Sequence, residues 1–486
     1  CNPVLIWVRT TSYVWKTTTG GRMALTSFKA YDVRGKVPSA LDENLTRRIG
    51  FAYAAEIRPE RVVIGHDARL SSPSLYAALA DGLTAAGVDV TGIGLCGTEE
   101  MYHAVFAHGF DGGIMVTGSH NPADENGLKM VRGNAVPISG DSGLFAIRDR
   151  VAADPPLPAG RSGHYTESTF RASYIRHILS QVALDHLNPF RIVADAGKRC
   201  AGPVLPALAS HLPFELILLH DEPDGAFPHG IPNPLLPEKR EGTARAVREH
   251  CADFGLAWDG DFDRCFFYDA SGRFIEGYYL VGMIATALLA ANPGSAIIHD
   301  PRLVWNTVEM VRKAGGIPIE SKTGHAFIKE RMRRENALYG GEMSAHHYFR
   351  DFAYCDSGML PWLLVAAHLS ATGQTLSQCL DDRMRIFPCS GEINSLVADP
   401  AETCARVERH YTDAALSITR VDGLSMEFSD WRFNLRASNT EPLLRLNVET
   451  RGHDELLREK TQELLRIIRK EHSDRTEGKA LGRPAA

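Results

Sequence analysis

A serine beside a histidine follows a short apolar run in the first third of the chain. The run Ile114–Val116 predicts a buried strand, and Gly118 ends it and lets the backbone approach a ligand closely. Ser119 would therefore stand just past the carboxyl end of the strand, the edge at which open α/β sheets bind ligands. His120 can carry a proton or contact a phosphate. The stretch favours a ligand-binding loop, and a polar surface turn is the alternative.

Three carboxylates at alternate positions, Asp259, Asp261 and Asp263, follow a second short apolar strand. Carboxylates spaced in this way can converge on one hard cation when the loop wraps around it. The loop is not an EF-hand, because the position that should carry its distal Glu is Ala270. With only Arg264 as a basic neighbour, the three charges would repel one another without a metal. The spacing favours a divalent cation site over a solvated acidic turn.

Two further loops carry polar side chains suited to a sugar phosphate. Glu342 alone would suggest a salt bridge at a strand end, but with Ser344 it follows a strand as the two loops above do, which favours hydroxyl binding. Arg436 begins a tight turn between the predicted strands Trp431–Leu435 and Leu443–Val448. Its side chains and backbone N–H groups are suited to clamping a phosphate, and a plain hairpin is the alternative. The other polar members of this turn are Ser438, Asn439 and Thr440.

Other charged residues carry weaker signals. Arg34 lies in a loop where a structural ion pair with Asp32 is favoured over ligand binding. Lys129 by itself is typical of a solvated charge. His325 is equally consistent with chemistry and with ordinary packing or capping. Their interpretation depends on the loops around them.

The composition is that of an ordinary globular protein. Hydrophobic residues make up 44% and charged residues 23% of the 486 positions, and the formal net charge is −6. This charge gives no general attraction to nucleic acid or to an anionic membrane, so an anionic ligand must be held by local Arg and Lys residues. We therefore expect neither nucleic acid nor membrane as a partner.

Nine cysteines occur without a C-x-x-C pair, which favours reduced thiols in a cytoplasmic protein without a zinc site or disulfide framework. No apolar run approaches the ~18–20 residues needed to span a bilayer. The sequence around Met23 resembles a natural start, so we expect residues 1–23 to be an extension without function.

The strand and helix patterns place the loops on a repeated plan. Strands alternate with helices before the Pro- and Gly-rich segment 154–160, and the same alternation restarts after it and again after residue 271. Alternation of this kind predicts mostly parallel sheets with helices on both faces, in three similar domains that present one loop each. The pattern changes near Phe387, and residues 454–472 predict an amphipathic helix. We expect domains at 24–160, 161–272, 273–386 and 387–472 and a disordered tail at 473–486.

With the four loops assembled, the chain resembles the bacterial phosphomannomutases of the α-D-phosphohexomutase superfamily. The motifs that carry the resemblance stand in family order and are Thr117–Pro122, Asp259–Arg264, Gly341–Ser344 and Arg436–Thr440. The similarity runs from about Leu25 to the C-terminal helix. In that family the four motifs are, in this order, the serine loop, the metal loop, the sugar loop and the phosphate loop. The residues of the metal and sugar loops are most similar to those of enzymes that supply GDP-mannose for capsule or O-antigen sugars.

The resemblance implies three similar α/β domains with mixed or parallel sheets and a smaller C-terminal α+β domain around a central cleft. It implies that Ser119 is phosphorylated and that one Mg²⁺ per chain is held by the phosphoserine with Asp259, Asp261 and Asp263. The implied reaction interconverts mannose 6-phosphate and mannose 1-phosphate through a 1,6-bisphosphate, with glucose or mannose 1,6-bisphosphate as activator. The enzyme would be a monomer or homodimer.

The resemblance also implies roles for individual residues. Acid–base and transfer chemistry at Ser119 would involve His120, Lys129, Arg34 and His325. Contacts to the sugar phosphate would come from ten residues: Tyr31, Arg264, Arg302, Glu342, Ser344, His346, Arg436, Ser438, Asn439 and Thr440.

Three positions depart from the family pattern, and several related functions compete. Phe262 stands where the metal loop often has Gly, Arg302 where relatives often carry Lys, and Glu441 where a small or polar residue is common. Met343 disfavours a phosphoglucosamine mutase, whose sugar loop usually carries Gln there. A dual-specificity phosphomannomutase/phosphoglucomutase remains an alternative, as does a metal-dependent sugar phosphatase from another class. A non-catalytic binding protein is disfavoured because no proposed ligand is lost.

Overall fold

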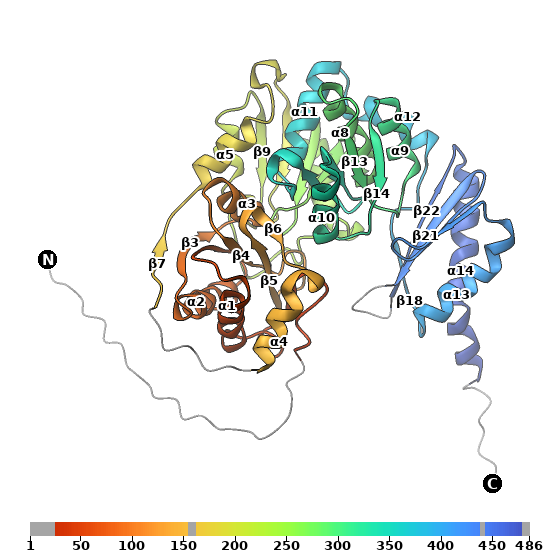
Figure 1. The fold of residues 1–486 in the computed structure, drawn as a ribbon. Helices are drawn as coiled ribbons and strands as arrows, with labels where there is room; N and C mark the ends of the chain where they lie inside the picture. The colour runs from red at the N-terminus through yellow and green to blue at the C-terminus, as the bar shows by residue number, and fades with distance from the viewer. Residues whose placement is uncertain (1–24, 154–161, 438–442, 479–486) are drawn as a thin grey trace, which may run out of the picture.

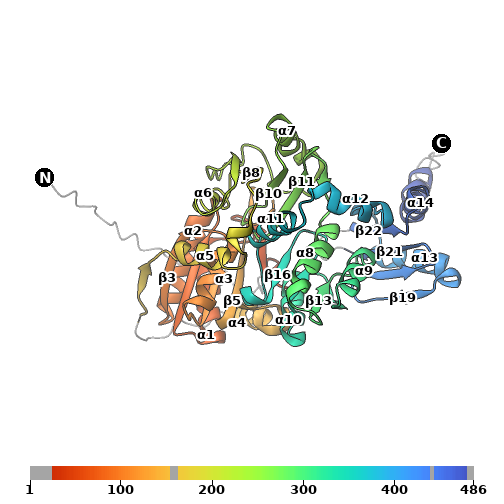
Figure 2. The ribbon, with the colours of Figure 1, turned by 90° about the horizontal axis from the view of Figure 1, so that it is seen from above.

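A computed structural model describes residues 25–153, 162–437 and 443–478, and each of its four domains is built on one sheet. The domains follow one another in an arc, from the first in red and orange to the fourth in blue (Figure 1). Seen from above, they keep this order from one end of the molecule to the other (Figure 2). In the described part of the chain, no helix combines the length and the apolar character needed to cross a bilayer.

The first sheet has the strand order β1-β5-β4-β2-β3-β7, with β6 paired to β5. Its strands are β1 (Val33–Lys36), β2 (Arg61–His66), β3 (Asp89–Leu95), β4 (Gly112–Val116), β5 (Glu125–Arg132), β6 (Val136–Pro137) and β7 (Tyr165–Glu167). Strands β4, β2, β3 and β7 are parallel, whereas β5 runs antiparallel to β4 and β1. The sheet is therefore mixed rather than mostly parallel, and β7 joins it from beyond the Pro-rich segment.

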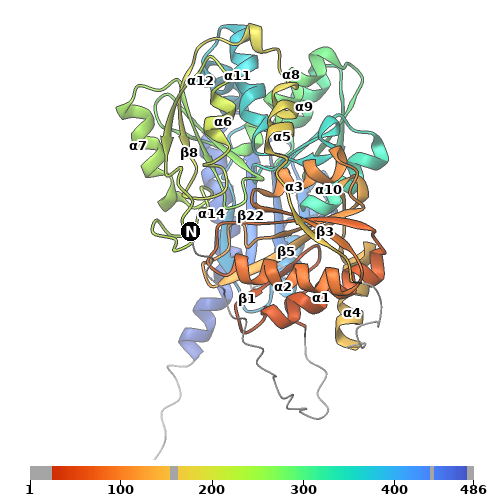
Figure 3. The same ribbon diagram turned by 90° about the vertical axis from the view of Figure 1, so that its left-hand side faces the viewer.

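Helices cover both faces of this first sheet. They are α1 (Glu43–Ile57), α2 (Ser72–Ala85), α3 (Thr98–Ala107) and α4 (Phe145–Ala153). Figure 3 shows α1 and α2 side by side on one face, with α3 on the other. Leu75, Leu79 and Leu83 of α2 are fully buried, because their i, i+4, i+8 spacing places them on one side of the helix.

The second and third domains repeat the strand plan of the first. The second sheet has the order β12-β11-β10-β8-β9 and the third β14-β13-β15-β16-β17. The strands are β8 (Arg191–Asp195), β9 (Glu215–Leu219), β10 (Phe254–Trp258), β11 (Cys265–Asp269), β12 (Phe274–Ile275), β13 (Ala296–His299), β14 (Ile317–Glu320), β15 (Tyr339–Gly341), β16 (His347–Phe349) and β17 (Cys355–Asp356). The helices are α5 (Arg171–Leu179), α6 (Leu205–Ala209), α7 (Glu241–Glu249), α8 (Gly277–Ala291), α9 (Trp305–Lys313), α10 (His325–Glu335), α11 (Leu360–Thr372) and α12 (Leu376–Ile386).

In all three sheets one strand pairs in parallel with two neighbours, and one of those neighbours then pairs antiparallel with the next strand of the chain. These parallel-to-antiparallel steps are β4 to β5, β10 to β11 and β15 to β16. The loops 117–124, 259–264 and 342–346 make the three connections. The three predicted functional loops therefore occupy one topological position, which is the structural basis of the internal repetition.

The fourth domain is a separate α+β unit. Its antiparallel sheet has the order β18-β22-β21-β20-β19. The elements are β18 (Ile393–Leu396), α13 (Pro400–Tyr411), β19 (Ser417–Thr419), β20 (Leu424–Glu427), β21 (Trp431–Ala437), β22 (Leu443–Thr450) and α14 (Asp454–Gly478). Helices α13 and α14 lie on one face of the sheet (Figure 1), and α14 continues beyond the expected end at His472.

One large apolar cluster runs through the first three domains, whereas the fourth has a cluster of its own. Met115, Trp258 and Tyr339 all belong to the large cluster, and Phe433 and Leu464 belong to the separate one. The fourth domain contacts the third through polar groups: Glu449 accepts a hydrogen bond from the Val304 backbone, and Arg432 donates to the carbonyls of Pro301 and Arg302. The first three domains are thus fused by a shared core, and the fourth is joined to them by hydrogen bonds and ion pairs.

A buried histidine lies among aromatic rings where the first and second domains meet. The His103 ring packs edge-on against Phe106 and Tyr174 and lies 5.4 Å from the His177 ring. Its Nδ1 atom is buried and has no hydrogen-bond partner. Burial, with the nearby charges of His177 and His108, lowers the pKa of His103 from 6.5 to about 3. The native state therefore keeps this ring neutral.

We expect His103→Phe to make the protein more resistant to acid. Because the native pKa lies below the unfolded value, the stabilisation from a neutral His103 is complete above pH 6.5 and is lost as the pH falls toward 3. At pH 5 the loss is about 2 kcal/mol, at ~1.4 kcal/mol per pH unit. Urea unfolding at pH 8 and pH 5 measures the difference, with exposed His211→Phe as control. An equal loss in wild type and His103→Phe would contradict the assignment.

Candidate active site

The serine loop places its hydroxyl against the acidic loop of the second domain. Ser119 follows β4, is 3% exposed, and has a left-handed backbone with φ of 46°. Its Oγ donates a hydrogen bond to Asp259 Oδ2 at 2.9 Å and lies 3.1 Å from His120 Nδ1. The serine loop and the acidic loop, predicted separately from the sequence, are therefore in contact. The Ser119 hydroxyl has both a carboxylate and an imidazole within hydrogen-bonding distance.

The acidic loop is buried and is held by cations from two domains. Asp259 Oδ2 accepts hydrogen bonds from Arg264 at 2.9 and 2.7 Å. Asp261 accepts from Lys129 at 2.7 Å, and Lys129 also pairs with Asp263. Lys129 is 4% exposed, so the interpretation of this residue as a solvated charge is wrong. A buried amino group needs paired carboxylates, and two of them lie in this loop.

The three aspartates fit a hard divalent cation. Each keeps one buried carboxylate oxygen, Oδ1, without a hydrogen-bond partner, and one oxygen from each of the three lies within 4.8 Å of the others. Buried acceptors are normally satisfied, so three carboxylates that each keep an unsatisfied oxygen and lie this close together suit a cation with oxygen ligands. These three residues are the candidate ligands of a divalent cation.

The charges of the loop are balanced unequally. Burial raises the pKa of Asp259, to about 7, although the Arg264 guanidinium opposes the rise. Burial also opposes ionisation of Asp261 and Asp263, but the Lys129 ammonium outweighs it and the pKa of each lies below its usual value. Lys129 is a cation in this arrangement, because the same two carboxylates raise its pKa against the effect of burial.

The sugar loop meets the acidic loop through one histidine. Glu342 accepts hydrogen bonds from the Gly324 backbone at 3.0 Å and from the Tyr348 hydroxyl at 2.5 Å. His346 Nε2 lies 3.8 Å from Asp263 Oδ1, and its Nδ1 lies 3.6 Å from Glu342 Oε2. Ser344 Oγ lies 3.2 Å from His346 Nδ1. The loops of the second and third domains are therefore in direct contact.

Three predicted residues of the first and third domains lie close by. His325 begins α10, and both of its ring nitrogens are buried and unpartnered. Tyr31 packs edge-on against it at 5.0 Å. Burial, reinforced by Lys329 and Lys129, holds the pKa of His325 well below 6.5, so its ring is a neutral base. Arg34 pairs with Asp32 at 2.8 Å, as favoured from the sequence, but it also donates to the Gly118 carbonyl at 2.6 Å.

The phosphate loop lies beside the sugar loop through shared ion pairs. Arg302 pairs with Asp300 at 2.7 Å and lies 3.5 Å from Glu342. Arg302 and Arg436 lie 3.7 and 3.5 Å from the same carboxylate oxygen, Glu392 Oε2. The remaining predicted members of this loop, Ser438, Asn439 and Thr440, lie outside the described residues.

Sequence reasoning missed several residues that complete the site. Thr98, the first residue of α3, donates its hydroxyl to Asp261 across the domain boundary. Lys329 of α10 pairs with Asp356 at 2.6 Å, close to Asp263 and His346. A threonine at a helix start suggests capping, and a lysine within a helix suggests solvent. Neither role could be recognised without knowing which distant segments of the chain lie together in the fold.

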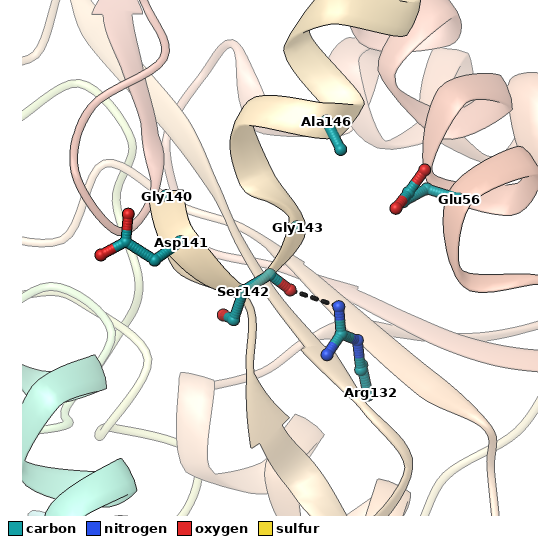
Figure 4. Close-up of a pocket in the computed structure, with 7 residues that line it drawn as sticks. All are labelled: Glu56, Arg132, Gly140, Asp141, Ser142, Gly143 and Ala146. Atoms are coloured by element: carbon teal, nitrogen blue, oxygen red, sulfur yellow. Dashed lines mark hydrogen bonds between the residues drawn. The ribbon is translucent and has the colours of Figure 1, made fainter.

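A separate surface pocket on the first domain contains none of the predicted site residues (Figure 4). It has a volume of about 430 Å³ and is lined by Glu56, Arg132 and the turn 140–143 with Ala146. Arg132 donates to the Ser142 carbonyl, as the dashed line shows. The side chains singled out from the sequence therefore do not line this pocket.

The four domains match the models of one protein family along most of the chain. The phosphoglucomutase/phosphomannomutase α/β/α domains I, II and III match residues 25–155, 172–272 and 276–387, and the C-terminal domain matches 392–466. The chain therefore belongs to the phosphoglucomutase/phosphomannomutase family, in the α-D-phosphohexomutase superfamily, and is an isomerase.

Within the family, the chain is similar to bacterial phosphomannomutases. A phosphomannomutase of Salmonella montevideo is 55% identical over 91% of this chain and 99% of its own length. A Xanthomonas campestris protein described as "Phosphohexose mutases" is 58% identical over 92% of this chain and its whole length. A crystal structure of a Burkholderia thailandensis phosphoglucomutase/phosphomannomutase family protein has a TM-score of 0.82 at 32% identity, covering 92% of this chain and 98% of its own. The predicted fold class and family are confirmed.

We expect Asp261→Asn to weaken Mg²⁺ binding at least tenfold, because the change removes one of the three negative charges that attract the cation. Isothermal titration calorimetry of the purified protein measures this without reference to activity. The matched control is Asp124→Asn, which removes the same charge from an exposed aspartate paired with Lys36. Equal Mg²⁺ affinity in Asp261→Asn and wild type would place the cation elsewhere.

Proposed function

We propose that the protein is a phosphomannomutase that interconverts mannose 6-phosphate and mannose 1-phosphate through a phosphoserine at Ser119. The observation that carries this proposal is the 2.9 Å contact of Ser119 Oγ with Asp259, the first residue of the acidic loop. A serine that carried a phosphoryl group here would place it beside three carboxylates with free oxygens. The family supplies the reaction class, and the phosphomannomutase relatives supply the sugar.

In the first transfer, the phosphoryl group leaves Ser119 Oγ for the free hydroxyl of the sugar phosphate and gives a 1,6-bisphosphate. The P–Oγ bond breaks, a P–O bond to the sugar forms, and the hydroxyl proton passes to a base while Oγ regains a proton. His325, neutral and unpartnered, is suited to take the hydroxyl proton, and His120, at 3.1 Å, is suited to exchange one with Oγ. The second transfer returns the other phosphate to Ser119.

Charge around the phosphoryl group decides whether the two anions can approach. A bound Mg²⁺, held by Asp259, Asp261, Asp263 and the phosphoserine, would supply positive charge to the transferring group. The chain adds Arg34, Lys129 and Arg264 around the same position. Glu342 and Ser344 would hold sugar hydroxyls, and Arg302 with Arg436 would hold the phosphate that is not reacting.

Mannose 1-phosphate would supply GDP-mannose synthesis for surface polysaccharide, as in the enzymes whose metal-loop and sugar-loop residues are most similar to those of this chain. A dual-specificity mutase is the second candidate, because the relative from Xanthomonas campestris carries a name that covers more than one hexose. Mannose and glucose differ only at C2. Assays with mannose 1-phosphate and glucose 1-phosphate side by side distinguish the two candidates, and release of free phosphate instead of a sugar phosphate would indicate a phosphatase.

We expect wild type treated with glucose 1,6-bisphosphate to gain about 80 Da, the mass of one phosphoryl group, and Ser119→Ala to gain none. Intact-mass spectrometry measures the gain, and a coupled assay measures turnover. Ser142→Ala is the matched control, because Ser142 is a serine of the same domain whose hydroxyl, among the described residues, bonds only to Ser139 and Pro137, neither of which is a site residue. Normal turnover by Ser119→Ala would overturn the phosphoserine assignment.

We expect Arg436→Ala to lower kcat/KM by about 10- to 100-fold, because charge-assisted bonds to a phosphate are worth ~1.5–3 kcal/mol. Since the same grip would position the intermediate for its second transfer, KM should rise, kcat should fall and more bisphosphate should escape. Steady-state kinetics and anion-exchange analysis of the products measure these effects. Unchanged KM and unchanged bisphosphate release would show that the phosphate is held elsewhere.

A further inference from the structure

A buried arginine lies under the serine loop and uses every one of its donors. The side chain of Arg69 is 1% exposed. Its Nη1 donates to the carbonyls of Pro122 and Glu125, at 2.5 and 2.7 Å, and its Nη2 to those of Ser119 and Asn121, at 2.8 and 2.7 Å. Its Nε donates to Asp67 at 3.2 Å. A guanidinium has five N–H groups, and all five are engaged.

The loop is shaped around this guanidinium. A Cβ atom on Gly118 would lie 2.4 Å from Arg69 Nε and Cζ, so the guanidinium occupies the space that a side chain would need. Asp67 completes the arrangement, because its Oδ2 also accepts from the Gly118 backbone at 3.1 Å and from the Thr117 hydroxyl at 2.9 Å. Arg69 and Asp67 together hold the loop from the residue before Gly118 to Glu125.

Ser119 needs such support because its backbone is left-handed, with φ of 46°, a region that serine rarely adopts unaided. This backbone conformation sets where the Ser119 side chain leaves the loop, and its Oγ lies 2.9 Å from Asp259 Oδ2. Arg69 binds the carbonyl of Ser119 itself and the carbonyls that follow it, so it fixes the conformation without touching Oγ. A misplacement of about 1 Å can cost ~100-fold in a transfer step.

The second domain packs against the same guanidinium. The ring of Phe227 lies between two arginines, 4.9 Å from Arg69 and 3.7 Å from Arg199. A Cβ atom on Gly225 would lie 2.4 Å from the Ala68 carbonyl oxygen, so the segment that carries Phe227 is pressed against the segment that carries Arg69. The loop that carries the nucleophile and the domain that carries the acidic loop are thus joined at Arg69.

We propose that Arg69 is a positioning residue for phosphoryl transfer, which holds Ser119 in register with the acidic loop through the five donors of its guanidinium. The proposal rests on the proposed function of Ser119 as the phosphoryl carrier. A lysine could supply the charge but not the planar fork, so the requirement is for guanidinium geometry rather than for charge.

We expect Arg69→Ala to lower kcat about 100-fold while KM stays within threefold, since Arg69 holds no part of the substrate. Arg69→Lys should recover less than tenfold of this loss. Guanidinium ion at about 20 mM should raise kcat of Arg69→Ala at least fivefold, with methylammonium without effect. Arg132→Ala is the matched control: it removes a guanidinium that donates to a carbonyl of the same domain outside the serine loop, and it should keep kcat and show no rescue.

Hydrogen–deuterium exchange separates this proposal from the proposed function. In Arg69→Ala, amides of residues 117–126 should exchange at least tenfold faster, with the rest of the first domain unchanged. Failure of wild type to gain a phosphoryl group would overturn the proposed function while this exchange test still stands. Wild-type kcat in Arg69→Ala, rescue by methylammonium, or unchanged exchange at 117–126 would each overturn the positioning role.

Discussion

The neutralisation of three buried carboxylates governs how the domains come together. Asp259, Asp261 and Asp263 lie in one loop, and isolated buried charges of one sign would be prohibitively unstable. Arg264 comes from the same loop, but Lys129 comes from the first domain, so the second domain cannot balance its own loop. Arg264 and Lys129 bring two positive charges against three carboxylates, and each Oδ1 atom still lacks a hydrogen-bond donor, so these two residues neutralise the loop only in part. The negative charge that is left on the loop would attract a cation.

The first three domains share one strand plan, but their loops carry different chemical groups. Each of the first three domains sends a loop from a parallel strand to its antiparallel neighbour, and each loop carries a different set of side chains. A hydroxyl stands on the first, three carboxylates on the second, and a carboxylate with a serine and histidine on the third. Because the first three domains share one apolar cluster, the loops are held in contact, with Ser119 Oγ 2.9 Å from Asp259 and His346 Nε2 3.8 Å from Asp263. Preorganisation of this kind is what phosphoryl transfer requires.

The sequence predicted the strands and the loops that follow them, because apolar runs ended by Gly and polar residues are local signals. It did not predict that Lys129 is buried, that Thr98 binds Asp261 or that Arg69 supports Ser119, because each depends on contacts between distant segments. Phe262 shows the limit clearly. Its φ of 46° explains why Gly is favoured there, yet Phe is tolerated because its ring fills the space beside Gly97, where a Cβ would lie 2.1 Å from the ring. Neither Phe262 nor Gly97, considered alone in the sequence, indicates that the ring of one packs against the other.

The fourth domain obeys a different rule from the other three, and the difference suits its proposed task. Its apolar cluster is separate, and its junction with the third domain consists of groups such as Glu449 and Arg432. Hydrogen bonds to charged groups exchange with water at a net cost of ~1.5–3 kcal/mol each, whereas separating a shared apolar core exposes its whole surface at ~25 cal/mol per Å². The bisphosphate of the proposed reaction would have to turn between two transfers, which needs a rigid reaction centre and a phosphate-binding domain that can move. The shared core provides the first, and the polar junction beneath Arg436 permits the second.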